Sequence, residues 1–366
     1  MKSGWIWLPK WSQEKETQET FVFFRKNMEL LEVPESFRIR ISADSRYKLY
    51  INGQFCEAGP SKGNDRLWFY DEVETAPYLK KGSNDWMVVV LHYTVSAKPG
   101  NHSIFRTATP GLYLESCQKD EAGQPVFCTD ESWKAKELSD IQIVSENPFF
   151  APLQIYEAVT ATEGNWTWRR KDTEAEKDCG ELENGWMNAW ECEAEALTEV
   201  LRREKLAERT IPFLKKIPRK FKGISKVLTS QFEKKQWEGF LAGENALEIP
   251  AHSQVCVDVD AGELMTGYLF LKMMGGQGAK ITLLQSESYV MSASEKPDGY
   301  GDLPIKKDRA DAEHGFLTGY VDTYQVCGEG TGGRPEIYEP FWFRTFRYIQ
   351  IKITTGEEPL TLQEFT

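Results

Sequence analysis

The sequence predicts an all-β fold: two antiparallel β-sandwich domains joined by a linker. Three observations predict it. Apolar and polar residues alternate with a period of two in many short stretches, turn signals separate those stretches, and one segment punctuated by prolines divides the chain. In a strand, every second side chain lies on the same face, so this alternation indicates strands with one buried and one solvated face.

The first sandwich is expected over residues 1–205. Residues 47–51 alternate and run into Asn52-Gly53, a strong signal for a two-residue hairpin turn. Residues 86–91 are a short continuous apolar run, which is typical of a buried central strand. Further strands are expected at residues 37–41, 111–115 and 125–128.

The linker is expected at residues 206–226. Pro212 and Pro218 break any regular element there, because proline lacks an amide donor and restricts the residue before it. Just before the linker, residues 191–209 are a candidate short helix, since apolar residues recur in them at helical spacing. That spacing is carried by Leu197, Val200 and Leu201.

The second sandwich is expected over residues 227–366. Residues 255–259 alternate, residues 275–278 form a glycine-rich turn between two strands, and the last strand is expected at residues 346–353. A long polar stretch, residues 286–322, interrupts these strands and has few apolar residues to anchor it. Loops of this length inside a compact domain are usually functional or partly disordered.

Composition limits the partners of the protein. The formal net charge is −12, which argues against nucleic acid, because phosphate backbones are bound by positive charge. No apolar run reaches about 18 residues, so no membrane partner is expected. The N-terminal residues do not resemble a secretory leader, and an odd number of cysteines, seven, favours reduced thiols in the cytoplasm.

The sequence carries no motif for catalysis, metal binding or a cofactor. No cysteines are spaced as CxxC, no HExxH occurs, and the four histidines have no Gly-x-Ser-x-Gly motif nearby. His92 lies in an apolar stretch and is expected in the core. We therefore assign no catalytic residue, metal ligand or cofactor. The 12 tryptophans leave two interpretations open: residues 68–71 or 166–170 stack on sugar rings, or these rings fill the cores.

Several segments, taken in order along the chain, resemble a known family. They resemble the N-terminal jelly-roll domain and the second, concanavalin-like β-domain that precede the catalytic barrel in glycoside hydrolase family 78, the bacterial α-L-rhamnosidases. In two places the sequence departs from the family: Thr345 stands where a glycine is usual, and residues 151–157 lack an acidic pattern often found there. The matching segments are residues 43–53 (ADSRYKLYING), 129–134 (TDESWK), 209–214 (RTIPFL), 262–271 (GELMTGYLFL), 319–324 (GYVDTY) and 338–351 (YEPFWFRTFRYIQI).

The resemblance implies a function. In this family an (α/α)₆ helical barrel follows the β-domains, and two carboxylates in it hydrolyse terminal α-L-rhamnose with inversion. The chain ends at Thr366, where that barrel would begin, so we expect a region that is inactive alone and acts as a scaffold for the barrel. Its expected partners are the helical barrel and, through the full enzyme, rhamnose-containing glycans or glycosides; association with a second copy stays open. The alternative is a stand-alone carbohydrate-binding β-sandwich protein.

The candidate contact residues come from two stretches of the second sandwich. Asp308, Arg309 and Asp311 lie in the long polar segment and are expected to contact sugar hydroxyls or the barrel, since loops on a rigid scaffold commonly carry function. The alternative is a solvated loop with no role. Trp342 is one of three consecutive aromatic residues, 341–343, which in a strand could not all face one core. An exposed aromatic patch is therefore expected there.

Overall fold

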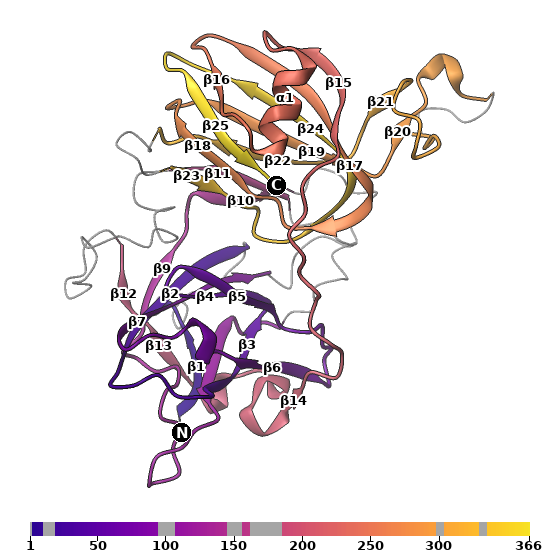
Figure 1. The fold of residues 1–366 in the computed structure, drawn as a ribbon. Coiled ribbons are helices and arrows are strands. Elements are labelled where there is room, and N and C mark those ends of the chain that lie inside the picture. The colour runs from indigo at the N-terminus through magenta and orange to yellow at the C-terminus, as the bar shows by residue number, and fades with distance from the viewer. Residues whose placement is uncertain are drawn as a thin grey trace. The chain divides into compact units, whose positions relative to one another are not determined.

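The protein folds into two compact all-β units, as the alternation predicts (Figure 1). The first unit contains the described residues up to 139 together with residues 185–214, and the second contains residues 140–144, 156–161 and the described residues from 215 onward. The computed structural model describes residues 2–9, 19–93, 107–144, 156–161, 185–297, 304–328 and 335–366.

The first unit is a sandwich of two six-stranded sheets. One sheet has the order β13-β1-β8-β3-β6-β14 and the other has the order β12-β9-β2-β7-β4-β5. Neighbouring strands are antiparallel except for β14, which pairs with β6 in parallel. The strands are β1 (Lys2–Trp7), β2 (Thr20–Leu30), β3 (Arg38–Asp44), β4 (Arg46–Ile51), β5 (Gln54–Gly59), β6 (Trp68–Glu74), β7 (Gly82–His92), β8 (Gly111–Ser116), β9 (Lys134–Glu137), β12 (Met187–Asn188), β13 (Trp190–Glu193) and β14 (Leu206–Glu208).

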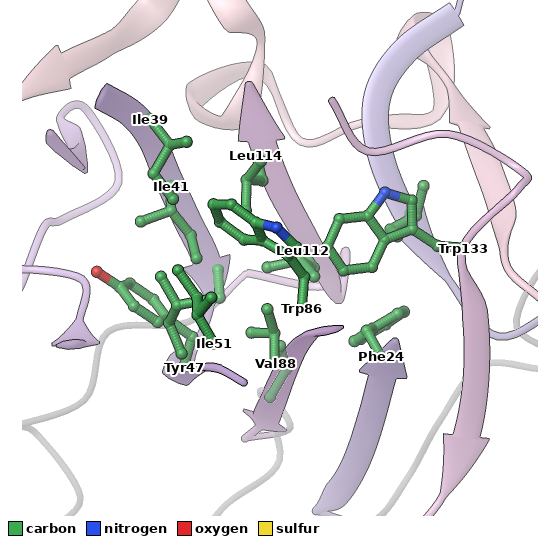
Figure 2. Packing of buried hydrophobic residues seen from close by; sticks show 14 of the residues in the cluster. Phe24, Ile39, Ile41, Tyr47, Ile51, Trp86, Val88, Leu112, Leu114 and Trp133 are labelled. Atoms are coloured by element: carbon green, nitrogen blue, oxygen red, sulfur yellow. The ribbon is translucent and has the colours of Figure 1, made fainter. Parts of the chain in front are cut away.

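The core of the first unit lies between these sheets and follows the predicted alternation. Figure 2 shows Ile39 and Ile41 of β3 packed in the same cluster as Trp86 of β7, and all three side chains are fully buried. Burying one such side chain contributes about 1.5–3 kcal/mol. The hairpin between β4 and β5 turns at Asn52 and Gly53, whose φ values of 53° and 72° are the positive angles that a type I′ turn requires.

Two expectations for the first unit are wrong. Residues 125–128 form no strand and make only isolated bridges, such as that between Glu115 and Cys128. Residues 191–209 form no α-helix: they contain β13, three short 3-10 turns and β14. Leu201 shows why, because its carbonyl accepts a hydrogen bond of 2.8 Å from the Trp5 indole instead of a helical amide. Its side chain is buried with Trp5 and Trp68, so the apolar spacing serves this second core.

The second unit has a seven-stranded sheet of order β10-β11-β22-β19-β24-β17-β15 and a four-stranded sheet of order β16-β25-β18-β23. Strands β20 and β21 form a separate two-stranded sheet. The strands are β10 (Ile141–Val144), β11 (Tyr156–Thr160), β15 (Gly223–Thr229), β16 (Leu247–Ile249), β17 (Gln254–Gly267), β18 (Leu271–Gly275), β19 (Lys280–Ser286), β20 (Tyr289–Val290), β21 (Phe316–Leu317), β22 (Tyr320–Gln325), β23 (Glu336–Tyr338), β24 (Arg344–Thr354) and β25 (Leu360–Phe365).

The central strands of this sheet were predictable. Val255 and Val257 of β17 are fully buried and lie opposite Ile353 and Ile351 of β24. The strand expected at residues 346–353 is β24, but it is not the last one, because β25 follows it.

One α-helix, α1 (Lys234–Ala242), lies in the second unit and was not predicted. Glu233 and Gln236 form a capping box at its start, and Gly243, with φ of 79°, ends it in a left-handed conformation. Trp237 and Phe240 are buried on its inner face. The two end signals were present in the sequence, but nine residues are too few for a clear apolar period.

Two strands cross the expected domain boundaries. The magenta strands β10 and β11 lie among the orange and yellow strands of the second unit (Figure 1), although their residues fall within 1–205. β11 pairs with β22 in parallel, with Ala158 opposite Thr323. The linker region 206–226 contains β14 of the first unit and the start of β15 of the second; residues 209–222 between them form no regular element.

Candidate functional site

The polar segment between β19 and β22 is anchored by an apolar floor that sequence reasoning missed. Strands β20 and β21 pair through Tyr289 opposite Leu317 and Val290 opposite Phe316. Tyr289 and Leu317 are buried in one cluster with Tyr348 of β24. The few apolar residues of this segment are therefore enough to anchor it, although they are single residues spaced too widely to form a pattern in the sequence.

Tyr289 also ties the segment to the sheet by polar contacts. Its hydroxyl donates to Asp258 Oδ2 at 2.7 Å, and it lies 3.0 Å from the hydroxyl of Ser225. The ammonium of Lys226 lies 4.1 Å from the centroid of the Tyr289 ring and donates to the Gly315 carbonyl at 3.1 Å. The base of the segment is thus fixed by β15 and β17 as well as by β24.

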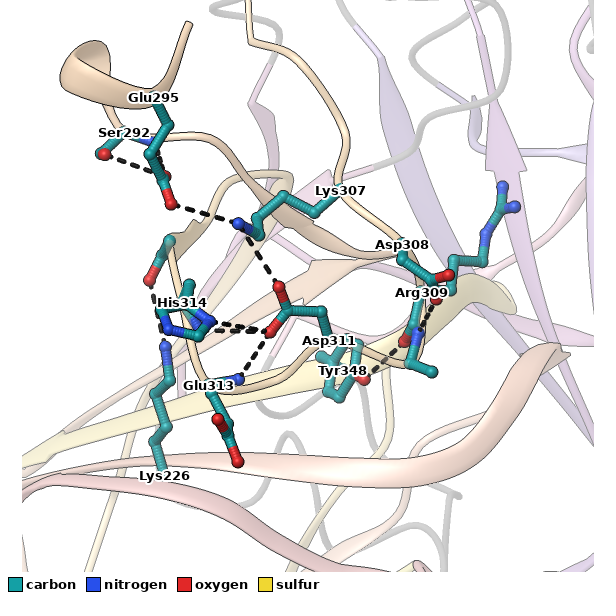
Figure 3. A network of polar contacts seen from close by, with 12 residues as sticks. Lys226, Ser292, Glu295, Lys307, Asp308, Arg309, Asp311, Glu313, His314 and Tyr348 are labelled. Atoms are coloured by element: carbon teal, nitrogen blue, oxygen red, sulfur yellow. Dashed lines mark hydrogen bonds and ion pairs between the residues drawn. The ribbon is translucent and has the colours of Figure 1, made fainter.

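A charged cluster holds the outer part of the segment (Figure 3). Lys307 Nζ lies 3.2 Å from Glu295 Oε1 and 3.3 Å from Asp311 Oδ2. Hydrogen bonds from the amide and hydroxyl of Ser292, together with Lys307, lower the pKa of Glu295 to about 2. Desolvation raises the pKa of Asp311, but the amides of Glu313 and His314 and the ammonium of Lys307 outweigh it and lower that pKa to about 2. Both carboxylates are therefore ionised across the physiological pH range.

The structure places Asp308, Arg309 and Asp311 together on this segment, but in different roles. Asp311 is committed to Lys307, so it serves the fold of the segment. Asp308 is exposed, and one of its carboxylate oxygens accepts the amide of Ala310 at 2.7 Å. The Arg309 side chain is 49% exposed and lies 3.4 Å from Glu287. Asp308 and Arg309 are therefore the members that another molecule could reach.

Trp342 lies apart from these three residues and is buried. It is 6% exposed and packs against Tyr268, Phe341 and Phe343, with ring centroids 6.3, 6.0 and 5.5 Å away. Residues 341–343 lie in a bend before β24 instead of a strand, so the rule of alternating faces does not apply to them. Phe341 is buried as well and Phe343 is half-buried, so these residues do not form the exposed aromatic patch that the sequence predicts.

A buried ion cluster joins β11, β22 and β24, and no pattern in the sequence indicated it. Arg344 makes two short contacts to Asp322, 2.6 Å from Nη2 to Oδ1 and 2.8 Å from Nε to Oδ2. Glu157 lies 3.9 Å from the same guanidinium and accepts hydrogen bonds from the Tyr338 hydroxyl at 3.1 Å and from the Phe341 amide at 2.9 Å. Two carboxylates therefore share one buried cation.

Burial and the neighbouring Asp322 raise the pKa of Glu157 to about 7, although Arg344 acts in the opposite direction. Glu157, Asp322 and Arg344 are 1%, 0% and 6% exposed. Two carboxylates that cleave a glycoside must flank an open cleft that holds the sugar. This pair faces one guanidinium inside the unit, so its role is to hold three strands together.

The structure shows where some of the aromatic residues that could stack on sugar rings lie. Trp68 is 2% exposed and belongs to the second core of the first unit, and Phe69 is buried beside it in β6. Residues 166–170 lie outside the described residues. His92 is 3% exposed and packs edge-on against Trp7, which confirms its assignment to the core.

Among the residues that the structure describes, no group of three or more His, Cys, Asp or Glu side chains is arranged to hold a metal ion. No helix among these residues is long and apolar enough to cross a membrane.

Fold and site together define an all-β protein of two sandwich units. In the charged clusters described above, most acidic and basic side chains pair with each other. Solved structures that share this fold include α-L-rhamnosidases. A GH78 family rhamnosidase of Bacillus sp. GL1 matches with a TM-score of 0.64 at 14% identity, over 99% of this chain and 54% of that chain. The α-L-rhamnosidase of Aspergillus terreus matches with a TM-score of 0.53 at 18% identity, over 96% of this chain and 35% of that chain.

The α-L-rhamnosidase of Dictyoglumus thermophilum also matches, with a TM-score of 0.50 at 15% identity, over 99% of this chain and 35% of that chain. At these identities the similarity shows a shared fold. This chain spans 54% of the first enzyme and 35% of each of the other two. No family model matches the sequence, and no curated protein matches it.

Proposed function

We propose that the chain is the non-catalytic all-β region of an α-L-rhamnosidase and acts as a scaffold for a helical catalytic domain. One observation carries this proposal: the Bacillus rhamnosidase shares the fold of this chain over 99% of its residues while using 54% of its own length. We place the catalytic residues in the part of such an enzyme that has no counterpart here.

The chemistry of glycoside hydrolysis supports this division. Hydrolysis needs an acid and a second carboxylate about 5–9.5 Å apart, with the sugar between them. The buried pair in this chain, Glu157 and Asp322, surrounds Arg344 and leaves no room for a sugar. The carboxylates Glu295 and Asp311 are both committed to Lys307. The charged clusters therefore stabilise a framework and do not form a reaction centre.

Within this proposal, Asp308 and Arg309 contact the sugar or the helical domain. They are the exposed members of a segment whose base is fixed to the sheet through Tyr289 and Tyr348. A fixed base with exposed charged side chains is the arrangement in which loops on rigid scaffolds carry function.

The test of the proposed function has two parts. The purified chain is incubated with an aryl α-L-rhamnoside, and we expect no release of the phenol above the rate in buffer. The gene is then read past the codon for Thr366, where we expect an open frame rich in amphipathic helices. Co-expression of that downstream segment with this chain is expected to give a complex that hydrolyses the rhamnoside.

Two results would contradict the proposal. One is turnover by this chain that survives repurification and is lost when one of its own carboxylates is replaced. The other is a stop codon directly after Thr366 together with sugar binding by the chain, which would favour the stand-alone carbohydrate-binding protein.

A further inference from the structure

The first unit contains a cavity of about 600 Å³ that neither the sequence motifs nor the proposed function uses. It lies among β1, β8 and the 3-10 turns that follow β13. Its apolar lining includes Tyr113, Leu114 and Leu197, all of them buried. This volume is within the range of about 300–1,000 Å³ that is typical of small-molecule sites.

Most charged groups of the cavity wall already have partners. Glu115 is paired with Arg203 and lies 3.7 Å from Arg40. Asp130 lies 3.1 Å from the ammonium of Lys26. The wall therefore contains both signs of charge in contact with each other, and these carboxylates do not leave an uncompensated site for a cation.

Three polar side chains of the wall can contact a ligand in the cavity. The Nε atom of Arg202 is buried and makes no hydrogen bond. The side-chain amide of Gln124 and the carboxylate of Glu204 also line the cavity, and both side chains are exposed, so a ligand can reach them. A buried donor that lacks an acceptor costs about 1–3 kcal/mol, so a ligand that supplies an acceptor to Arg202 recovers that free energy.

We propose that this cavity binds a neutral, hydroxyl-rich ring, the chemistry of a single sugar unit. A hydroxyl group both donates and accepts, so one ligand can accept from Arg202, exchange hydrogen bonds with Gln124 and donate to Glu204. The apolar lining, Leu197 and Tyr113, suits the C–H face of such a ring. An anion would meet the carboxylate of Glu204, and a cation would meet the guanidinium of Arg202. This inference concerns the first unit and does not depend on the proposed function.

The experiment uses the full chain and ligand-observed saturation-transfer NMR, followed by calorimetric titration. The probes are L-rhamnose, D-glucose, D-galactose and D-mannose, and a short lysine-containing peptide serves as the cationic comparison. We expect at least one sugar to bind and the peptide not to bind. Arg202→Ala removes one charge-assisted hydrogen bond and is expected to weaken binding about tenfold. Ala194→Trp fills the cavity with a side chain and is expected to abolish binding.

The control is Arg66→Ala, which removes an exposed arginine of the same unit that does not line the cavity and is expected to leave the affinity unchanged. Thermal unfolding of each variant shows whether it is folded. The inference is overturned if no sugar binds to the unchanged chain, if the folded Ala194→Trp variant binds as well as the unchanged chain, or if the peptide binds in preference to every sugar. None of these results bears on the hydrolysis and co-expression tests above.

Discussion

At the scale of single residues, the cluster of Glu157, Asp322 and Arg344 is unbalanced. Arg344 makes two contacts below 3 Å to Asp322, but its contact to Glu157 is 3.9 Å. One cation compensates one carboxylate fully, and burial penalises the charge on the other. Burial and the neighbouring Asp322 therefore raise the pKa of Glu157, and Glu157 is the titrating group of the cluster.

The first prediction concerns pH. Because the pKa of Glu157 is raised from 4.5 to about 7 in the folded state, that state binds a proton more tightly than the unfolded chain does. Protonated Glu157 therefore contributes its full stabilisation below pH 4.5. As the pH rises from 4.5 to 7 this contribution is lost, so the free energy of unfolding falls. Glu157→Gln removes the titration. Urea unfolding at several pH values should show a shallower loss of stability for the variant, by up to about 1.4 kcal/mol per pH unit.

The matched control is Glu263→Gln, because Glu263 is an exposed carboxylate of the same unit. It should leave the pH profile of the unchanged chain intact. The amide that Glu157→Gln introduces makes its own hydrogen bonds, which shift the whole profile by a constant, so the slope is the quantity to compare. Parallel profiles for Glu157→Gln and the unchanged chain would show that Glu157 is not the titrating group.

At the scale of elements, the segment between β19 and β22 separates its anchor from its exposed charges. Tyr289 is fully buried, and its hydroxyl is held by Asp258 at 2.7 Å. Asp308 and Arg309 lie at the exposed end of the same segment. An exposed ion pair contributes about 0–1 kcal/mol, whereas truncating a buried aromatic residue costs about 3–5 kcal/mol.

The second prediction follows from that separation. The double variant Asp308→Ala and Arg309→Ala should change the free energy of unfolding by no more than about 0.5 kcal/mol, as ordinary surface sites do. Tyr289→Ala should lower it by about 3–5 kcal/mol. Urea unfolding of the two variants at pH 7 measures both values. An equal loss of stability in both would mean that the charged cluster, and not the apolar floor, anchors the segment.

The elements also show what the sequence could and could not predict. Strands β3, β4 and β17 were predictable because each has buried apolar residues at every second position over part of its length. The 3-10 turns around Leu201 were not predictable, because the apolar spacing there also fits an α-helix. In the structure the Leu201 carbonyl instead accepts a hydrogen bond from the Trp5 indole. The partners of the buried cluster lie far apart in the chain, with Glu157 bonded through its amide to Asp322 across 165 residues. Local patterns carry no information about such pairs.

At the scale of the whole molecule, the second unit is not a continuous piece of chain. Its seven-stranded sheet includes β10 and β11, which come before the last residues of the first unit in the sequence. Without these two strands the sheet would end at β22. The buried Arg344 would then lose its contact with the Glu157 carboxylate.

The third prediction tests this dependence. A fragment of residues 215–366 should unfold at a lower temperature than the second unit does in the full chain. Adding a synthetic peptide of residues 140–161 should raise that temperature, and raise it further at higher peptide concentration, because a ligand that binds only the folded state stabilises it by mass action. The control peptide carries Val159→Asp, which places a charge at a position that is 2% exposed. If the two peptides have the same effect, or neither has any, the strands are not required by the sheet.

The pairing of β11 with β22 also has a consequence in time, during synthesis on the ribosome. The residues that pair are separated by 165 positions, and the ribosome adds about 5–20 residues per second. Strand β11 is therefore made roughly 10–30 seconds before its partner exists. During that interval β10 covers one edge of it, since the two strands form an antiparallel hairpin of their own. An isolated hairpin is only marginally stable in water, so the nascent chain exposes an unpaired strand edge for many seconds. Slow translation of residues 161–325 prolongs that exposure. A chaperone that binds extended polypeptide would act during this part of synthesis.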